Sequence, residues 1–355
     1  MSNESKELAA KAQRLSGKKI ADTLMNSALY ILMIIAVIII QINNPRFLGP
    51  ASLVNILSQT AAYLPAALGI AGCIVLTGTD LSAGRAVGLT ACISASLLQK
   101  ADSATKMWPE IGTMNIFVVI LIALALGALI GAFNGFFVAK FKLHPFIVTL
   151  GTQLILYTCL LLYVQMGNNG GMAISSLDSS YTDFIKGSFI SVPTGNGTSA
   201  PIPNYVWFAL ALTALMWFIW NKTTFGKNMF ALGSNEEAAR VSGVNVFATT
   251  IMVFALAGAM YGWTGFVEGA RIGSNTANTG FNYELDAIAA CVIGGVSFVG
   301  GIGKIRGIVI GVLLLRLIFV GLNMASVPQD LIYLVKGGII LFACALDMRK
   351  YLVKK

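Results

Sequence analysis

The stretch NIFVVILIALALGALIGAFNGFFVA, residues 115–139, contains no charged side chain. It is longer than the ~20 apolar residues that a helix needs to cross a bilayer. Similar runs recur along the chain at about 24–42, 52–76, 86–99, 145–165, 204–221, 246–267, 285–299, 305–323 and 329–346. The pattern predicts an all-α polytopic membrane protein with about ten transmembrane helices. Because 86–99 and 285–299 are short, each is either a full span or a discontinuous, re-entrant half-helix.

The composition agrees with a membrane protein and excludes other classes. Of the 355 residues, 56% are hydrophobic and only 11% are charged, with a mean hydropathy of +0.78. Soluble domains usually carry about 25% charged residues. The net charge of +9 comes from small basic groups between apolar runs, which argues against a nucleic-acid partner. A single histidine, and cysteines that fall in apolar runs without CxxC spacing, predict no metal site.

The distribution of basic residues predicts the orientation. The first apolar run is too long for a signal peptide and no A-x-A site follows it, so we expect a retained span after a cytoplasmic segment 1–23. With this end inside, 17 of the 24 Lys and Arg residues fall in inner segments and five in outer ones. We therefore expect cytoplasmic termini, a transmembrane domain over 24–346 and a cytoplasmic tail over 347–355. Two long loops are predicted, 167–203 outside and 222–245 inside.

The run GTDLSAGR at 78–85 places charged and hydroxyl groups between two apolar runs. Burying a charged group at membrane depth costs about 2.5–3.5 kcal/mol on insertion scales. One interpretation is a discontinuous element beside a translocation path, because broken backbone is tolerated there only next to protein or water. The other is a short cytoplasmic turn, in which Asp80 or Ser82 caps the next helix and Asp80 pairs with Arg85. The physical arguments favour neither.

The run ELDAIAACVIGGVSFVGGIG at 284–303 opens with two acids, Glu284 and Asp286, which would stabilise a helix N-terminus. The glycines at 300, 301 and 303 precede Lys304, as in a phosphate-binding loop. The match fails, because Phe298 and Ile305 stand where that motif needs Gly and Ser or Thr. We predict no nucleotide site in this chain. The small-residue repeats Gly127, Gly131, Gly135 and Gly307, Gly311 predict close helix contacts.

The inner loop contains GKNMFALGSNEEAARVSGV at 226–244. Ser234 or Asn235 would cap a short helix through Arg240, with two glutamates in its first turn and Gly243 behind its end. A short charged helix of this kind is suited to contact a soluble partner. An ordinary helical connector is the alternative.

These three blocks resemble the ribose/galactose-type permeases of bacterial ATP-binding-cassette importers, and the resemblance covers nearly the whole chain. The surroundings of Arg85 resemble the galactose/methyl-galactoside branch more than the ribose branch. The resemblance implies a homodimer around one path in the bacterial inner membrane. It also implies a cytoplasmic ATPase, usually a fused double cassette that holds ATP and Mg, and a periplasmic sugar-binding protein. The chain itself would be no enzyme and would bind no cofactor.

In such importers a cytoplasmic permease helix fits a groove on the ATPase, and here it maps to about 233–243. The residues expected to couple this chain to the ATPase are Asn235, Glu236, Glu237, Ala238, Ala239, Arg240, Ser242 and Gly243. A transport path must release its solute, so we expect weakly polar lining. The candidates are Asp80, Ser82, Arg85, Asn134, Thr149, Thr152 and Gln153.

Two further classes stay open as alternatives. An ion- or proton-coupled secondary transporter would need a relay of intramembrane acids, and most acids here lie at span ends. The second alternative is a permease of the same importer class that carries another solute, such as ribose. An intramembrane enzyme is disfavoured by the single histidine and by the absence of HExxH or a Ser/His motif.

Overall fold

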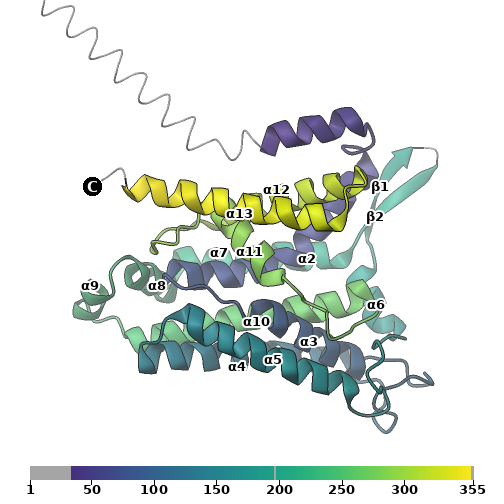
Figure 1. Ribbon diagram of the computed structural model, residues 1–355. Coiled ribbons are helices and arrows are strands. Elements are labelled where there is room, and N and C mark those ends of the chain that lie inside the picture. The colour runs from purple at the N-terminus through teal and green to yellow at the C-terminus, as the bar shows by residue number, and fades with distance from the viewer. Residues whose placement is uncertain (1–32, 196, 353–355) are drawn as a thin grey trace, which may run out of the picture. The chain divides into compact units, whose positions relative to one another are not determined.

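The computed structural model describes residues 33–195 and 197–352, so segment 1–23 and the start of the first predicted span lie outside the described residues. The described chain is mainly helical and divides into two compact units (Figure 1). The larger is Leu48–Leu317. The smaller combines the described part of Met1–Phe47 with Ile318–Lys355.

Helices occupy the predicted apolar runs of the larger unit. The long ones are α2 (Pro50–Val75), α4 (Ile116–Phe141), α5 (Pro145–Gln165), α7 (Asn204–Lys222), α10 (Val246–Ile272) and α12 (Ile305–Met324), which continues into the smaller unit. Among described residues, α2, α4, α5, α10 and α12 are long and apolar enough to cross a membrane. Side-chain caps stabilise the starts of α4, α5 and α10; at α4, for example, Asn115 accepts a hydrogen bond from Phe117 N.

Two helices are too short to cross a lipid bilayer. The 15 residues of α3 (Ala83–Leu97) span about 22 Å and the 11 residues of α11 (Tyr283–Ile293) about 16 Å, against a hydrocarbon core of about 30 Å. Both are buried along nearly their whole lengths. The runs 86–99 and 285–299 are therefore half-helices enclosed by protein. Their irregular flanks can exist at this depth because protein surrounds them.

Glycines bring the main helices into backbone contact, as their spacing predicts. Helix α10 packs along α4, α3 and α2. A Cβ atom on Gly131 of α4 would lie 1.9 Å from the carbonyl oxygen of Phe254 in α10, and Gly127 meets Gly258 in the same way. Gly311 of α12 lies equally close to Ala290 of α11. Only glycine fits at such distances, so small residues decide these contacts.

The predicted outer loop corrects the all-α expectation. Segment 167–203 contains the helix α6 (Ser179–Lys186) and an antiparallel hairpin of β1 (Ile190–Gly195) and β2 (Thr198–Ile202). The hairpin was missed, although the sequence Gly195-Asn196-Gly197 between two short runs is a hairpin signal. Asp178 caps α6 by accepting from Ser180 N at 2.9 Å, and the hydrogen bonds from Ser180 lower the pKa of its carboxyl group.

The smaller unit contains the helix Met33–Asn43, the end of α12 and α13 (Gln329–Leu352). Asn44 Nδ2 donates to Met324 O at 3.2 Å, and Gly321 contacts Ile40. Helix α13 continues past the predicted end at 346, so the described part of the expected tail 347–355 is helical through Leu352.

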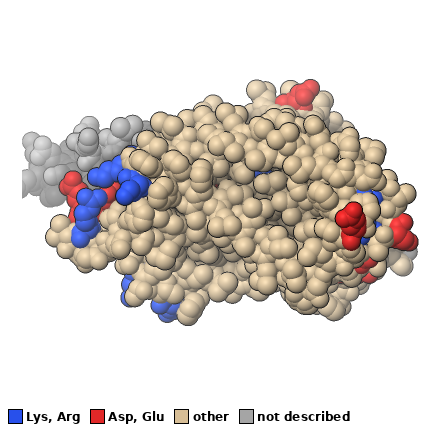
Figure 2. Space-filling model, turned by 90° about the horizontal axis from the view of Figure 1, so that it is seen from below, with Lys and Arg blue, Asp and Glu red and all other residues tan. Residues whose placement is uncertain are grey.

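Charged residues gather at two ends of the face over α4 and α5 (Figure 2). The surface between them is almost free of Lys, Arg, Asp and Glu, as expected for a surface that contacts lipid chains. Helices α8 (Thr224–Ser234) and α9 (Glu236–Val241) lie at one end of the larger unit, and α6 with the hairpin lies at the other (Figure 1).

The α4–α10 contact predicts a contrast between two glycines. Gly131→Ala should destabilise the protein by about 1–3 kcal/mol, because the added methyl meets backbone that cannot move aside. Gly151→Ala on α5 is the matched control, because its added methyl meets no heavy atom within 4 Å. The unfolding midpoint in detergent should fall for Gly131→Ala only. Equal midpoints would contradict the packing argument.

Candidate transport and coupling sites

A buried polar cluster ties the start of α3 to α4 and α5. Asp80 Oδ1 accepts from Ser82 N at 3.0 Å and from the Ser82 hydroxyl at 2.6 Å. The same hydroxyl accepts from Asn134 Nδ2 at 2.9 Å, and Asn134 Oδ1 accepts from the Thr152 hydroxyl at 2.6 Å. All four residues are buried. A fifth, Thr149, accepts from Leu81 N and donates to Thr79 O.

Five of the seven predicted path residues therefore belong to one structure, which we call the Asp80 cluster: Asp80, Ser82, Asn134, Thr149 and Thr152. Gln153 is half-buried on α5 and lies outside these hydrogen bonds. The cluster satisfies most of the polar groups that interrupt the apolar sequence, but Asp80 Oδ2 is buried without a hydrogen-bond partner among the described residues. It is closed to solvent in the single chain, so a role in lining a path stays a prediction.

Arg85 departs from the sequence-based interpretation. It lies in the first turn of α3, is only 8% exposed, and donates from Nη1 to Ala277 O at 3.2 Å. Its guanidinium carbon lies 4.2 Å from the ring centroid of Tyr157. The predicted pairing with Asp80 is wrong, because Ser82 binds Asp80 Oδ1 and Arg85 has other partners. Arg85 is also no member of an inner loop, since α3 begins at Ala83.

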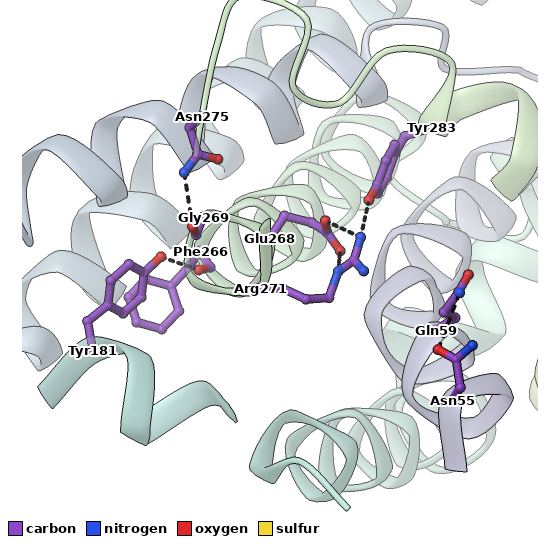
Figure 3. A network of polar contacts seen from close by, with 9 residues as sticks. All are labelled: Asn55, Gln59, Tyr181, Phe266, Glu268, Gly269, Arg271, Asn275 and Tyr283. Atoms are coloured by element: carbon purple, nitrogen blue, oxygen red, sulfur yellow. Dashed lines mark hydrogen bonds and ion pairs between the residues drawn. The ribbon is translucent and has the colours of Figure 1, made fainter. Parts of the chain in front are cut away.

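A second polar structure joins α10, α11, α2 and α12. Arg271 donates to both carboxylate oxygens of Glu268, at 2.6 and 2.7 Å, although Glu268 is fully buried. Its Nη2 also lies 3.4 Å from the Tyr283 hydroxyl at the start of α11. Figure 3 shows Arg271 extending from α10 toward Tyr283 and the neighbouring helix.

The same structure continues through stacked rings. The Tyr283 ring lies 4.2 Å from that of Tyr63 on α2, nearly parallel to it. The guanidinium carbon of Arg316 on α12 lies 3.4 Å from the Tyr63 ring centroid, and Arg316 Nη2 donates to Asp286 at 2.5 Å. Glu268, Arg271, Tyr283, Tyr63, Arg316 and Asp286 form what we call the arginine–tyrosine chain. Each arginine has an acid and an aromatic neighbour, which offsets its desolvation.

Sequence reasoning missed the arginine–tyrosine chain. It interpreted Asp286 as a residue that stabilises a helix N-terminus and gave no role to Arg316, although a cation inside the apolar run 305–323 is itself a signal. Glu284 makes a tertiary contact that the sequence did not indicate. A Cβ atom on Gly84 would lie 2.0 Å from Glu284 Oε2, so this acid lies directly against the start of α3.

The predicted charged helix is present as α9. Asn235 caps it by accepting from Ala238 N at 2.9 Å, Arg240 pairs with Glu236, and Gly243 follows with a φ of +85°. The helix itself is confirmed. Of the expected coupling residues, Ala239 is buried and serves as an anchor, while the others are exposed: Asn235, Glu236, Glu237, Ala238, Arg240, Ser242 and Gly243. Val241 was not predicted, yet this apolar side chain is 90% exposed beside them.

Backbone contacts connect α8 and the glycine segment at 300–301 to the end of α2. Gly301 N donates to Val75 O at 2.9 Å, and a Cβ atom on Gly233 would lie 1.9 Å from that oxygen. A cavity of about 770 Å³ adjoins this contact and is lined by Thr77, Gly233, Asn235 and Arg240, among others. Val75 is the last residue of α2, so the coupling region abuts the irregular segment that leads to Asp80.

Membrane-length helices, two enclosed half-helices and an exposed charged helix define a polytopic membrane permease. Residues 52–344 match the family described as branched-chain amino acid transport system / permease component, and the chain belongs to this family. The galactose/methyl galactoside import permease protein MglC of Salmonella typhimurium is 46% identical, over 96% of this chain and 99% of the relative. The protein of the same name from Treponema pallidum is 38% identical, over 88% of this chain and 59% of that relative. The ribose import permease protein RbsC of Escherichia coli is 34% identical, over 92% and 95%. No solved structure matches the chain significantly.

The Arg316–Asp286 pair predicts unequal effects of single and double substitutions. Arg316→Met removes the cation that balances buried Asp286, so it should cost about 3–5 kcal/mol of stability. Adding Asp286→Asn should recover part of that loss, because no unbalanced charge then remains. Unfolding midpoints in detergent measure both. A double variant no more stable than the single variant would show that charge balance is not the cause.

Proposed function

We propose that this chain is the permease subunit of an ATP-binding-cassette importer that moves galactose or methyl galactoside from periplasm to cytoplasm by alternating access. The observation that carries the proposal is the 46% identity, over nearly its whole length, to proteins named galactose/methyl galactoside import permease. The exposed, capped α9 supports a partner on one face of the membrane.

The proposed location is the bacterial inner membrane, with both termini cytoplasmic. About ten helices then lie in the membrane, and α3 and α11 reach only part of the way. In this orientation α8 and α9 face the cytoplasm, while α6 and the β1–β2 hairpin face the periplasm. The excess of basic residues in the inner segments supports this assignment.

The proposed assembly contains a second copy of the chain, a cytoplasmic ATPase and a periplasmic sugar-binding protein. The ATPase, expected as a fused double cassette, would hold ATP and Mg and carry out the hydrolysis. Val241 supports docking at α9, because an apolar side chain this exposed on an aqueous helix is suited to an interface.

The proposed movement begins at α9. Closure of the cassettes would displace Glu236, Glu237 and Arg240, and the contact of Gly233 with Val75 would carry the displacement to the segment before Asp80. The half-helix α3 would then shift with the Asp80 cluster, and the helices would rock between outward-open and inward-open states. The alternative of a proton-coupled transporter is disfavoured, because Glu268 and Asp286 are each paired with an arginine.

The coupling role of α9 predicts the effect of reversing one charge. Arg240→Glu should abolish sugar uptake by cells while leaving insertion into the membrane unchanged. The swap Glu236→Arg with Arg240→Glu is the control, because it restores the pair within α9 but reverses the charges offered to a partner. The swap should stay inactive. Restored uptake would mean that the pair only stabilises α9.

Val241 gives a separate prediction about docking. Val241→Asp should weaken retention of the ATPase on the purified permease by about tenfold or more, as for a central interface residue. Phe189→Asp is the matched control, since this residue is 85% exposed at the opposite end, beside the hairpin. Equal retention by both variants would contradict docking at α9.

The substrate can be tested with reconstituted permease and ATPase. We expect a galactose-loaded binding protein to stimulate ATP hydrolysis and drive sugar accumulation in vesicles, and a ribose-loaded binding protein to do neither. Ribose-specific stimulation would assign the alternative substrate. Accumulation by vesicles that hold only this chain, without the ATPase, would overturn the importer proposal.

A further inference from the structure

Helix α2 carries two amides where a membrane span would be expected to be apolar. Asn55 and Gln59 are spaced four residues apart, and Tyr63 follows four residues later, so all three lie along one side of the helix. Asn55 is exposed, and Gln59 and Tyr63 are half-buried. At 1.5 Å per residue the row runs about 12 Å from the N-terminal part of α2 to its middle.

The opposite side of α2 is different. Leu53 and Leu57 are 47% and 39% exposed, and at 100° per residue Leu57 lies about 200° around the helix from both amides. One side of this segment thus presents leucines and the other presents amides. An exposed leucine suits lipid. Gln59 Nε2 donates to Asn55 Oδ1 at 3.5 Å, and the remaining donors and acceptors of these amides need water, a ligand or another polar group.

A third polar group faces the amide row. Arg271 is 27% exposed, and Figure 3 shows it extending from α10 toward the helix that carries Asn55 and Gln59. Its Nε and Nη2 bind Glu268, which fixes the guanidinium in place. A guanidinium has five N–H donors, so further donors remain on Nη1 for a ligand. The row ends at Tyr63, where Arg316 lies against the ring.

Resting on the proposed function, we infer that Asn55, Gln59 and Arg271 form a monosaccharide-contacting stretch of the translocation path. Amide and guanidinium groups donate to sugar hydroxyls, and the amide oxygens accept from them. Partial exposure keeps these contacts weak enough to exchange with water, as transport requires. The stretch leads from the α2 N-terminus toward the arginine–tyrosine chain. It is separate from the buried Asp80 cluster, which was the path predicted from sequence.

The first test measures water access. Single cysteines would replace Asn55, Gln59, Leu53 and Leu57 in a background with Cys159→Ser and Cys344→Ser, because Cys159 is exposed and Cys344 is only partly buried. A charged methanethiosulfonate reagent should label positions 55 and 59 on intact membranes at least tenfold faster than positions 53 and 57, because only the amide side faces water. Equal labelling rates on the two sides would overturn the inference.

The second test measures transport by the reconstituted permease, ATPase and binding protein. Asn55→Leu with Gln59→Leu should lower galactose uptake below saturation about tenfold, because two hydrogen-bonding groups are lost. ATP hydrolysis stimulated by loaded binding protein should continue, so more ATP is used per sugar. Leu53→Ala with Leu57→Ala is the control and should transport normally.

The outcomes separate this inference from the proposed function. If the unsubstituted complex takes up no sugar with ATP, the proposed function fails and this inference fails with it. If that complex transports and the double leucine variant transports equally well, only the sugar-contacting stretch is overturned. If the variant instead loses its dimeric size in detergent, the amides are contacts between copies and the inference is also overturned.

Discussion

Broken helices and paired charges inside an apolar bundle depend on one constraint. A polar group at membrane depth needs a partner supplied by the protein, because lipid offers none. Helices α3 and α11 can end part-way because neighbouring helices enclose them. Glu268 and Asp286 can be buried because Arg271 and Arg316 bind them. The glycine contacts of α4 with α10 serve the same end, since they bring the enclosing helices close enough to exclude lipid.

The two polar structures differ in chemistry, and this separates their roles. The Asp80 cluster is a buried set of hydroxyl, amide and carboxylate hydrogen bonds in which Asp80 Oδ2 has no partner within the described part of the chain. The arginine–tyrosine chain ends at Arg271, a cation that remains partly exposed beside the amides of α2. Glu284 lies against Gly84, so the starts of the two half-helices touch. A shift of α3 would therefore reach α11, whose Tyr283 contacts Arg271 of the proposed sugar-contacting stretch.

Local patterns in the sequence were sufficient for the helices and for the cap of α9. Apolar length predicted the long helices, and Asn235 with Gly243 predicted both ends of α9. Contacts between distant residues were not available from such patterns. Asp286 and Arg316 are 30 residues apart, and nothing local indicates that they pair. One of the two interpretations paired Arg85 with Asp80 because they are close in sequence, yet Arg85 donates from the first turn of α3 to Ala277 O. The hairpin was overlooked because length and hydropathy report spans and say little about short strands.

The link between α8, which precedes α9, and the end of α2 includes direct backbone contacts. Gly233, Gly301 and Val75 meet through main-chain atoms, so no rotamer lies between them to absorb a displacement. Side-chain contacts can repack when one partner moves by about an ångström, whereas a main-chain contact must move as a unit or separate. The glycines at 300 and 301 have left-handed backbone, with φ of +89° and +68°, which lets this segment approach the end of α2. A glycine run that resembles a phosphate loop in sequence is thus explained by close packing, at the point where a soluble motor would have to act on a membrane path.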